Sequence, residues 1–278
     1  MSTYPSRKGV PLRIYENQRP APSGLILEDY LEDEEIGLLK TGKEAEVYLI
    51  ERRARDRSCL LAEKRYRPAA ERAFKNDIAY RSHRRLDGIV RDGDRLRRAT
   101  KTRALQLAMD KKTAFGRKAL AGMWIDAEWS MLQRLYQAGA SVPYPVAMLD
   151  EGILMEFVGD RDGAAPRLAQ ARVERRDLPG LFDQVRENLF TFARAGVVHA
   201  DLSPYNVLLR DGRIVVIDLP QAVPSLENLE ATDFLHRDVH NICAWFVRKG
   251  MDLDPEDVFV EVLSVSFEYQ MEDSFYAH

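Results

Sequence analysis

The sequence predicts an α+β fold of two lobes, an antiparallel-sheet lobe over residues 31–158 and a mainly helical lobe over 159–278. The first observation is a pair of short apolar runs, 46–50 and 59–64, with the length and spacing of adjacent strands. The second is the helical spacing of apolar residues in the later part of the chain. The third is the turn-rich segment 159–166, which lies where the two lobes would join.

Composition restricts the class of protein. With 278 residues, of which 45% are hydrophobic and 31% charged, the chain resembles a soluble globular protein with a substantial core. The formal net charge of -3 excludes a globally basic nucleic-acid binder. Cys59 and Cys243 are too few for a disulfide framework, and we interpret both as buried free thiols.

The first 30 residues are rich in proline, serine and charge, which predicts a flexible arm (1–30) rather than packed structure. Residues 1–22 lack the apolar core of a signal peptide. No uninterrupted apolar run approaches the ~18 residues that a membrane-spanning helix needs. Together these observations predict a cytoplasmic protein without a membrane partner.

The two apolar runs of the first lobe are separated by the charged segment 51–58, which predicts an antiparallel hairpin with its turn there. The segment 65–118 then carries 17 Lys or Arg against 6 Asp or Glu. This basic insertion is either a solvated helical part of the first lobe or a surface for RNA or another polyanion. No aromatic interleaving or recognisable RNA motif favours the second interpretation.

A helix and a strand complete the first lobe. Apolar residues recur at helical spacing over 124–138, and Gly139 follows as a stop signal. Glu128 lies on this predicted helix. The apolar run 152–158 predicts a strand directly before the turn-rich junction between the lobes.

The second lobe begins with a long predicted helix over 178–195, which ends before a glycine. An Asp-Gly turn then introduces a short strand over 214–217, with Asp218 at its end. Helices over 229–249 and 255–268 complete a mainly α lobe.

The loop between the long helix and the short strand carries the pattern H-x-D-x-x-x-x-N, formed by His199, Asp201 and Asn206. Phosphoryl transfer from ATP requires a bound metal ion, a positioned nucleophile and neutralised phosphate charge. Asp201 would accept the proton of the attacking hydroxyl, Asn206 and Asp218 would offer oxygen ligands to Mg²⁺, and His199 would orient the loop. Each residue alone is ordinary in a turn, but the complete pattern followed by a strand and Asp218 indicates nucleotide-dependent phosphotransfer.

The first lobe offers two further candidates. Thr41–Ala45 precedes the first clear strand, and Gly42 and Lys43 are candidate phosphate contacts there. This segment has neither G-x-x-x-x-G-K-[ST] nor G-x-G-x-x-G, so it is equally a simple strand-entry turn. Lys64 ends the next strand and could contact phosphate if it pairs with Glu128; the alternative is two surface charges.

Four motifs are similar to those of the RIO kinases, which are atypical serine/threonine protein kinases, and point towards the first branch of that family. The motifs are Thr41–Ala45, His199–Ser203, Ile217–Gln221 and Asp233–Ile242. The resemblance covers roughly residues 38 to 250. It implies a bilobal protein-kinase-like fold, with ATP in a cleft between the lobes and no activation segment. The sequence agrees, since neither D-F-G nor A-P-E follows Asp218.

The resemblance also implies roles for individual residues. Lys64 contacts phosphate, Glu128 pairs with it, Asp201 is catalytic, and Asn206 and Asp218 bind Mg²⁺, with Mn²⁺ as an alternative. The hinge residues Met155, Glu156 and Phe157 contact the nucleotide. In this family the aspartate at the position of Asp218 can itself receive phosphate, which would make ATPase cycling part of the activity.

These inferences favour an ATP-dependent serine/threonine protein kinase that also phosphorylates itself, with an unknown protein substrate. One alternative is a small-molecule kinase of the aminoglycoside or choline type, whose loop pattern is similar. A second alternative is an ATP-gated factor that docks on RNA or a ribosomal particle through 65–118, because the family is linked to maturation of the small ribosomal subunit. The basic insertion is longer than the family's flexible loop at this place.

Overall fold

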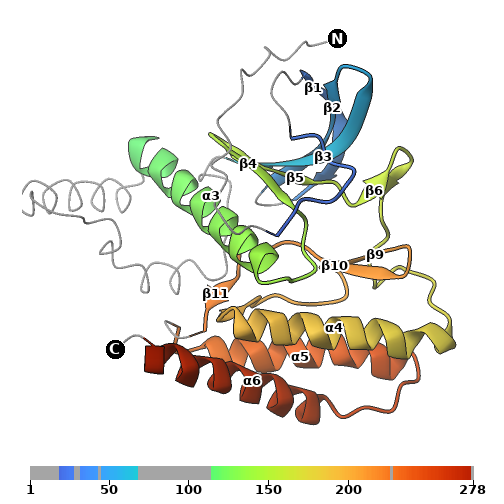
Figure 1. Ribbon diagram of the computed structural model, residues 1–278, viewed down its shortest axis with the longest axis vertical. Helices are drawn as coiled ribbons and strands as arrows, with labels where there is room; N and C mark the ends of the chain where they lie inside the picture. Colours follow the sequence, from blue (N-terminus) through green and yellow to red (C-terminus); the bar gives the residue numbers. More distant parts are fainter. Residues whose placement is uncertain (1–18, 28–31, 43–44, 68–113, 226–227, 277–278) are drawn as a thin grey trace, which may run out of the picture.

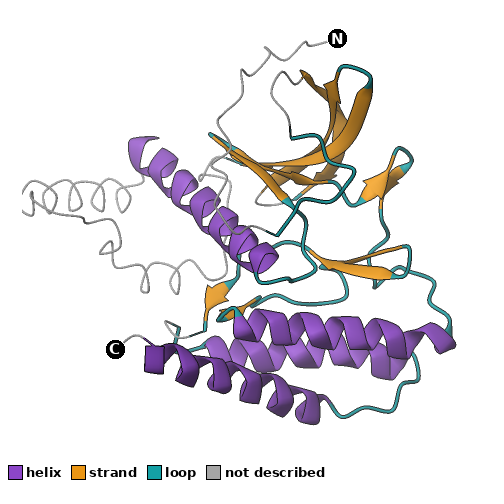
Figure 2. Ribbon diagram, viewed as in Figure 1, coloured by secondary structure: helices purple, strands orange, loops and turns teal. Residues whose placement is uncertain are grey.

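The computed structural model describes residues 19–27, 32–42, 45–67, 114–225 and 228–276. They form a sheet lobe above a mainly helical lobe (Figure 1). Figure 2 shows the division by secondary structure: strands build most of the first lobe, and long helices build the base of the second. The predicted α+β class is confirmed.

The first lobe is built on an antiparallel sheet with the strand order β1-β2-β3-β5-β4. β2 and β3 form the predicted hairpin, in which Val47 is opposite Lys64. β3 also pairs with β5, where Ile153 is opposite Lys64, so Lys64 lies on the central strand of the sheet. The strands are β1 (Glu32–Thr41), β2 (Ala45–Ala54), β3 (Arg57–Tyr66), β4 (Pro145–Leu149) and β5 (Gly152–Glu156).

The turn of this hairpin is shorter than the sequence predicts. β2 continues to Ala54 and β3 begins at Arg57, so the turn needs only two residues, of which Arg55 has a φ of 53°. Glu51 and Arg52, which the sequence assigns to the turn, lie within a strand and are buried. Their charge predicts a turn, because the sequence does not show the partners that neutralise them in the folded protein.

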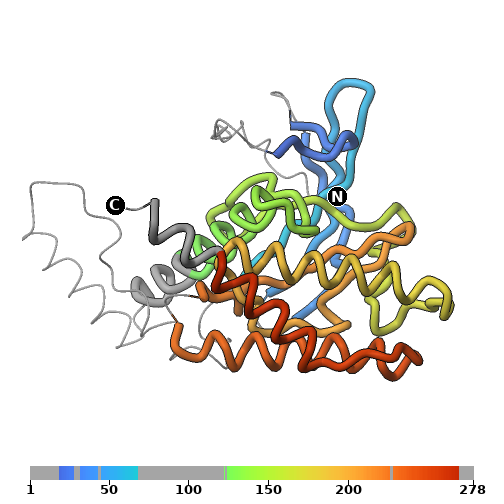
Figure 3. Tube along the Cα trace, turned by 60° about the horizontal axis from the view of Figure 1, so that its bottom comes forward, coloured from blue at the N-terminus to red at the C-terminus, as the bar shows by residue number. Residues whose placement is uncertain are grey.

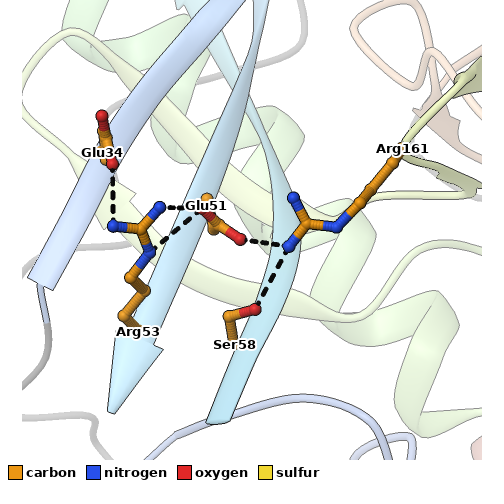
Figure 4. A network of polar contacts seen from close by, with 5 residues as sticks. All are labelled: Glu34, Glu51, Arg53, Ser58 and Arg161. Carbon is orange, nitrogen blue, oxygen red and sulfur yellow. Dashed lines mark hydrogen bonds and ion pairs between the residues drawn. The ribbon is translucent and has the colours of Figure 1, made fainter. Parts of the chain in front are cut away.

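Figure 4 shows how the burial of Glu51 is compensated. Its carboxylate accepts hydrogen bonds from Arg53 on the same strand and from Arg161, which lies between the short strands β6 (Gly159–Asp160) and β7 (Gly163–Ala164). Arg53 also contacts Glu34 on β1 at 3.2 Å, and Arg161 reaches the Ser58 hydroxyl at 3.5 Å. Because a buried charge is tolerated when it is paired, these contacts let the strand continue through charged residues.

Helix α3 (Ala114–Gln137) lies beside the sheet and contacts β4 and β5 (Figure 1). It begins at Ala114, ten residues before the predicted start at residue 124. Ile125, Leu132 and Leu135 recur at helical spacing and are buried. The same packing carries Glu128 into the interior, where its side chain is 4% exposed.

The second lobe consists mainly of α4, α5 and α6, which lie side by side in Figures 1 and 3. On α4 the buried residues include Leu181, Val185 and Leu189, one turn apart, so this helix packs with one apolar face. The helical elements are η3 (Arg175–Asp177), α4 (Leu178–Arg194), α5 (Ala231–Arg248) and α6 (Pro255–Tyr276).

Short antiparallel strand pairs complete the second lobe, and two of their strands, β8 and β9, flank the loop that carries the phosphotransfer pattern. The hairpin of β9 and β10 contains the predicted strand before Asp218, and β8 pairs with β11. The hairpin of β6 and β7 follows β5, just after the predicted lobe boundary near residue 158. The strands are β6 (Gly159–Asp160), β7 (Gly163–Ala164), β8 (Val197–Val198), β9 (Val207–Arg210), β10 (Arg213–Val216) and β11 (Val223–Pro224).

The predicted flexible arm differs from the structure over residues 19–27. Arg19 donates a hydrogen bond to the carbonyl oxygen of Ala140 at 2.9 Å, and Tyr136 donates its hydroxyl to the carbonyl oxygen of Pro20 at 2.7 Å. Ile26 is 3% exposed. This segment therefore packs on the first lobe through contacts more than 100 residues apart in sequence, which composition cannot reveal. Residues 1–18 of the arm lie outside the described part.

Two other predictions meet the structure in part. Residues 68–113 of the basic insertion lie outside the described residues, while 65–66 end β3, Arg67 follows it, and 114–118 begin α3. Both cysteines are free; Cys243 is buried as predicted, whereas Cys59 is only half-buried. Across the described residues, every helix is too short or too polar to cross a bilayer.

Candidate active site

A cavity of about 590 Å³ lies between the two lobes. Side chains of the sheet form one apolar wall, including Val47 and Ala62, and Leu208 and Ile217 belong to the opposite wall. The predicted site residues that line it are Gly42, Lys64, Glu128, Met155, Glu156, Phe157 and Asp218. A cavity with apolar walls and a few charged groups suits a nucleotide, whose base is flat and whose phosphates are charged.

Lys64 connects the two sides of this cavity. Its Nζ atom lies 2.8 Å from Oε1 of Glu128 on α3 and 2.9 Å from Oδ1 of Asp218, which follows β10. The Lys64 and Glu128 side chains are buried, whereas 36% of the Asp218 side chain is exposed. Three distant parts of the chain thus place one ammonium group between two carboxylates.

The ammonium of Lys64 and the carboxylates of Asp218 and Glu128 stabilise one another's charged forms. Burial alone lowers the pKa of Lys64, but Asp218 and Glu128 outweigh it and raise the pKa above its usual value. The positive charge of Lys64 lowers the pKa of Asp218 to about 2. Burial raises the pKa of Glu128, and the same ammonium opposes that shift. Lys64 and Asp218 are therefore charged at neutral pH.

The loop from His199 to Asn206 lies between β8 and β9. Asn206 donates its side-chain amide to the backbone oxygen of Asp201 at 2.8 Å and to its carboxylate at 3.2 Å. Asp201 is exposed, whereas Asn206 is buried. Neither is among the described residues that line the cavity itself; the loop is joined to the cavity wall through His199, which contacts both Asp201 and the wall residue Ile217.

His199 has the structural role that the sequence predicts. Its Nδ1 atom accepts the backbone N–H of Asp201 at 3.3 Å, and its Nε2 atom lies 3.1 Å from the carbonyl oxygen of Ile217. A carbonyl oxygen can only accept, so Nε2 carries the proton. Burial lowers the pKa of His199, which keeps the ring neutral. The imidazole therefore joins the Asp201 loop to the segment before Asp218.

Comparison with known proteins decides the family. A model of the RIO domain matches residues 94–258, which is more than half of the chain. The chain belongs to the RIO family. Membership confirms the resemblance seen in the sequence motifs, and the family uses ATP and a divalent metal ion.

Similar proteins carry the same family name. The RIO-type serine/threonine-protein kinase Rio1 of Haloferax volcanii is 40% identical over 136 residues, which is 49% of this chain and 46% of that protein. The protein of the same name in Thermoplasma acidophilum is 30% identical, over 53% of this chain and 76% of its own. A probable serine/threonine-protein kinase RIO1 homolog of Encephalitozoon cuniculi is 32% identical, over 81% and 57%. The match thus spans only about half of the Haloferax and Encephalitozoon relatives.

Within this RIO domain, Asp238 on α5 holds the backbone of the Asp201 loop in place, a role that sequence analysis missed. Its two carboxylate oxygens accept the backbone N–H groups of Ala200 at 2.7 Å and Leu202 at 2.9 Å. Arg237 donates to the carbonyl oxygen of Ala200, which has a φ of 63°. Burial raises the pKa of Asp238 to about 7, although the two N–H groups oppose that shift. An aspartate at a position of the apolar helical face, with Leu235, Val239 and Ile242 around it, is the signal that could have revealed it.

Two cationic residues of the cavity were also missed. Lys40 near the end of β1 and Arg167 after β7 both line it, on opposite sides. Arg167 donates to the carbonyl oxygen of Tyr205 at 2.6 Å, which ties the cavity to the Asp201 loop. The chain has 41 Lys and Arg residues, so their type alone could not single out these two. They add positive charge to the cavity, and Lys40 interacts electrostatically with Asp218.

The remaining predicted nucleotide contacts differ in availability. The backbone N–H of Glu156 donates to Tyr144 at 2.9 Å, and its carboxylate accepts the Tyr144 N–H at 3.1 Å, so this residue is engaged within the protein. Met155 and Phe157 remain on the wall of the cavity. At Gly42, an added Cβ atom would lie 3.0 Å from the Ala45 carbonyl oxygen, so the turn itself disfavours a side chain. Lys43 lies outside the described residues.

The donor set fits a divalent metal ion. Asp218 offers an ionised carboxylate that is partly exposed, with a φ of 71° at its backbone. Asn206 uses its amide nitrogen on Asp201, which leaves its amide oxygen to act as a ligand. Carboxylate and amide oxygens are hard ligands of the kind that Mg²⁺ and Mn²⁺ take. These two residues are therefore the candidates to hold the ion.

Proposed function

We propose that this chain is a Mg-ATP-dependent serine/threonine protein kinase of RIO type. It transfers the γ-phosphate of ATP to a protein hydroxyl, including hydroxyls of its own chain. The observation that carries the proposal is the contact of Lys64 with both Glu128 and Asp218, at 2.8 and 2.9 Å, inside the cavity between the lobes. In kinases, a lysine held by a glutamate binds phosphate, and an aspartate beside it holds the metal ion.

Each of these residues then has a distinct role in the reaction. Lys64 neutralises phosphate charge, and Glu128 keeps its ammonium in place. Asp201 accepts the proton of the attacking hydroxyl, and the amide of Asn206 orients its carboxylate. When bound, Mg²⁺, with Mn²⁺ as the alternative, neutralises the phosphate oxygens, and Asp218 and Asn206 supply its protein ligands.

Asp218 has a second task in this proposal. About a third of its side chain is exposed, so it can meet a phosphoryl group as well as a metal ion. Attack by its carboxylate oxygen on the γ-phosphorus would break the bond to the bridging oxygen, release ADP and form an acyl phosphate. Water would then release phosphate and regenerate the carboxylate. ATPase cycling of this kind predicts a phosphate that hydroxylamine removes.

Purified protein with γ-labelled ATP tests the proposal. The wild type should label itself or an added protein substrate, and Asp201→Asn should lower the rate by about 10² to 10⁴-fold, the usual contribution of a general base. Asp211→Asn is the matched control, because Asp211 is exposed in the turn between β9 and β10. Equal labelling by the wild type and Asp201→Asn would contradict the assignment.

Mapping the labelled residue by mass spectrometry separates the outcomes. Phosphoserine or phosphothreonine supports the kinase, whereas a hydroxylamine-sensitive label on Asp218 supports the cycling. Rapid phosphorylation of a sugar or an amino alcohol, with negligible protein labelling, would instead support the small-molecule kinase.

Partners and location remain part of the proposal. The basic residues predicted to contact RNA or a ribosomal particle, such as Arg84 and Arg97, lie outside the described residues. RNA binding that weakens with salt, and that is lost when they are replaced, would support this contact. The absence of RNA binding at low salt would count against it. The cytoplasmic location stays a prediction.

A further inference from the structure

A second cluster of metal-binding side chains lies away from the cavity, between α5 and α6. His236 and His240 lie one helical turn apart on α5, so both occupy the same face of the helix. Figure 1 shows that the chain turns back after α5, so that α6 begins alongside the middle of α5 rather than beyond its end. This return places Glu256, the second residue of α6, opposite the two histidines.

The three side chains converge on one point. The Nε2 atom of His236 lies 2.8 Å from Oε1 of Glu256, and the Nε2 atom of His240 lies 3.0 Å from the same oxygen. One possible ligand atom from each residue lies within 4.8 Å of the other two. The rings of the two histidines are 4.2 Å apart, and Phe259 packs edge-on against His236 at 4.9 Å. The imidazoles are therefore positioned by packing as well as by their shared partner.

This spacing is close to that of a tetrahedral metal site. Zn²⁺ binds imidazole nitrogen at about 2.0 to 2.1 Å, which separates tetrahedral ligand atoms by about 3.3 Å. The two nitrogen-to-oxygen distances here are 2.8 and 3.0 Å, so an ion requires only a small outward movement of these side chains. A metal ion would bind the two Nε2 atoms in the tautomer that carries its proton on Nδ1, so that each imidazole stays neutral.

Exposure and charge also suit an ion from solution. The side chains of His236, His240 and Glu256 are 42%, 37% and 56% exposed, which leaves space for a water molecule as fourth ligand. The start of α6 is acidic: Asp254 accepts the backbone N–H of Glu256 at 2.9 Å, and Asp257 follows it. Negative charge around the carboxylate favours the approach of a cation.

We propose that His236, His240 and Glu256 bind one divalent transition-metal ion of the Zn²⁺ class. Two imidazoles and one carboxylate favour Zn²⁺ or Co²⁺ over Mg²⁺, which takes oxygen ligands. The site is separate from the proposed kinase centre, whose ligands are oxygens of Asn206 and Asp218. Arg237 and Asp238 lie between the two histidines on α5, so the ion would join α6 to the helix that supports the Asp201 loop.

The test is a calorimetric titration of tag-free, chelator-treated full-length protein with ZnCl₂ in excess MgCl₂, which occupies the oxygen site. The wild type should bind one Zn²⁺ per chain, and its thermal unfolding midpoint should rise, because a ligand of the folded state stabilises it. His240→Gln and Glu256→Gln should each weaken binding by at least about tenfold, as expected when a metal site loses a ligand.

Glu261→Gln is the matched control, since Glu261 lies on α6 like Glu256 but pairs with Arg186 on α4, outside the cluster. It should bind Zn²⁺ as tightly as the wild type. Circular dichroism of each variant confirms that it is folded. No saturable Zn²⁺ binding by the wild type, or equal affinity in the wild type, His240→Gln and Glu256→Gln, would overturn the proposal.

Discussion

The two sides of the cavity hold their charged residues by different means. On the sheet side, Lys64 and Glu128 meet as a buried ion pair, and Lys64 also reaches Asp218. On the helical side, Asp238 is equally buried but meets the backbone N–H groups of Ala200 and Leu202 rather than a cation. The first arrangement fixes side chains, and the second fixes the shape of a loop.

The two arrangements differ in which substitutions they tolerate without loss of stability. Removing one member of a buried ion pair leaves an uncompensated charge, whereas removing both can be nearly neutral. Removing Asp238 leaves buried backbone N–H groups without their acceptor, and exchanging a second side chain for an apolar one does not remove a backbone N–H. The sheet side should therefore be repairable by a paired substitution, and the helical side should not.

The largest effect on stability is expected from Lys64→Met, which leaves the buried carboxylate of Glu128 without its cation. The free energy of unfolding should fall by about 3 to 5 kcal/mol, as for other broken buried pairs. Chemical denaturation measures it. Arg186→Met, which breaks an exposed ion pair with Glu261, is the control and should cost less than about 1 kcal/mol.

Adding Glu128→Met to Lys64→Met sharpens the comparison. The double variant should recover most of the lost stability, because two apolar side chains then replace two charges. If the double variant is as unstable as the sum of the two single variants, the ion pair does not behave as one unit.

A somewhat smaller effect is expected from Asp238→Ala. The N–H groups of Ala200 and Leu202 lose their acceptors, at a cost of about 1 to 3 kcal/mol for each buried group. Phosphotransfer should fall as well, because the Asp201 loop loses its support. Stability equal to the wild type by chemical denaturation would show that water or another group replaces the carboxylate.

The Asp238 contribution should also depend on pH. Burial raises its pKa from 3.8 to about 7, so the folded state binds this proton more tightly than the unfolded state. The stability that Asp238 adds is then fully present below pH 3.8 and lost as the pH rises towards about 7. The stability difference between wild type and Asp238→Ala should be larger at low pH. A difference that grows with pH would mean that the two N–H groups and Arg237 outweigh burial.

The sequence predicts those parts of the molecule whose signals are local. The hairpin of β2 and β3, the helix with Glu128 and the strand before Asp218 follow from apolar periodicity. The loop pattern of His199, Asp201 and Asn206 is also local, and the structure gives His199 the orienting contacts that the pattern implies.

What the sequence could not predict depends on partners far along the chain. The charge of Glu51 predicts a turn, because its partner Arg161 lies 110 residues later in the sequence. Arg19 and Ile26 pack although their segment has the composition of a flexible arm. Asp238 acts on a backbone that lies 36 to 38 residues earlier. In each case a long-range contact overrides the local preference.

The central claim is that the cavity binds Mg-ATP through Lys64 and Asp218 and transfers phosphate through Asp201. Calorimetric titration with Mg-ADP, combined with single-turnover phosphotransfer, tests it most directly. We predict that Asp201→Asn keeps wild-type nucleotide affinity but loses turnover, whereas Asp218→Asn loses the Mg²⁺-dependent part of the affinity as well. Undiminished turnover in Asp201→Asn, or Mg²⁺-dependent affinity that Asp218→Asn leaves unchanged, would contradict the account.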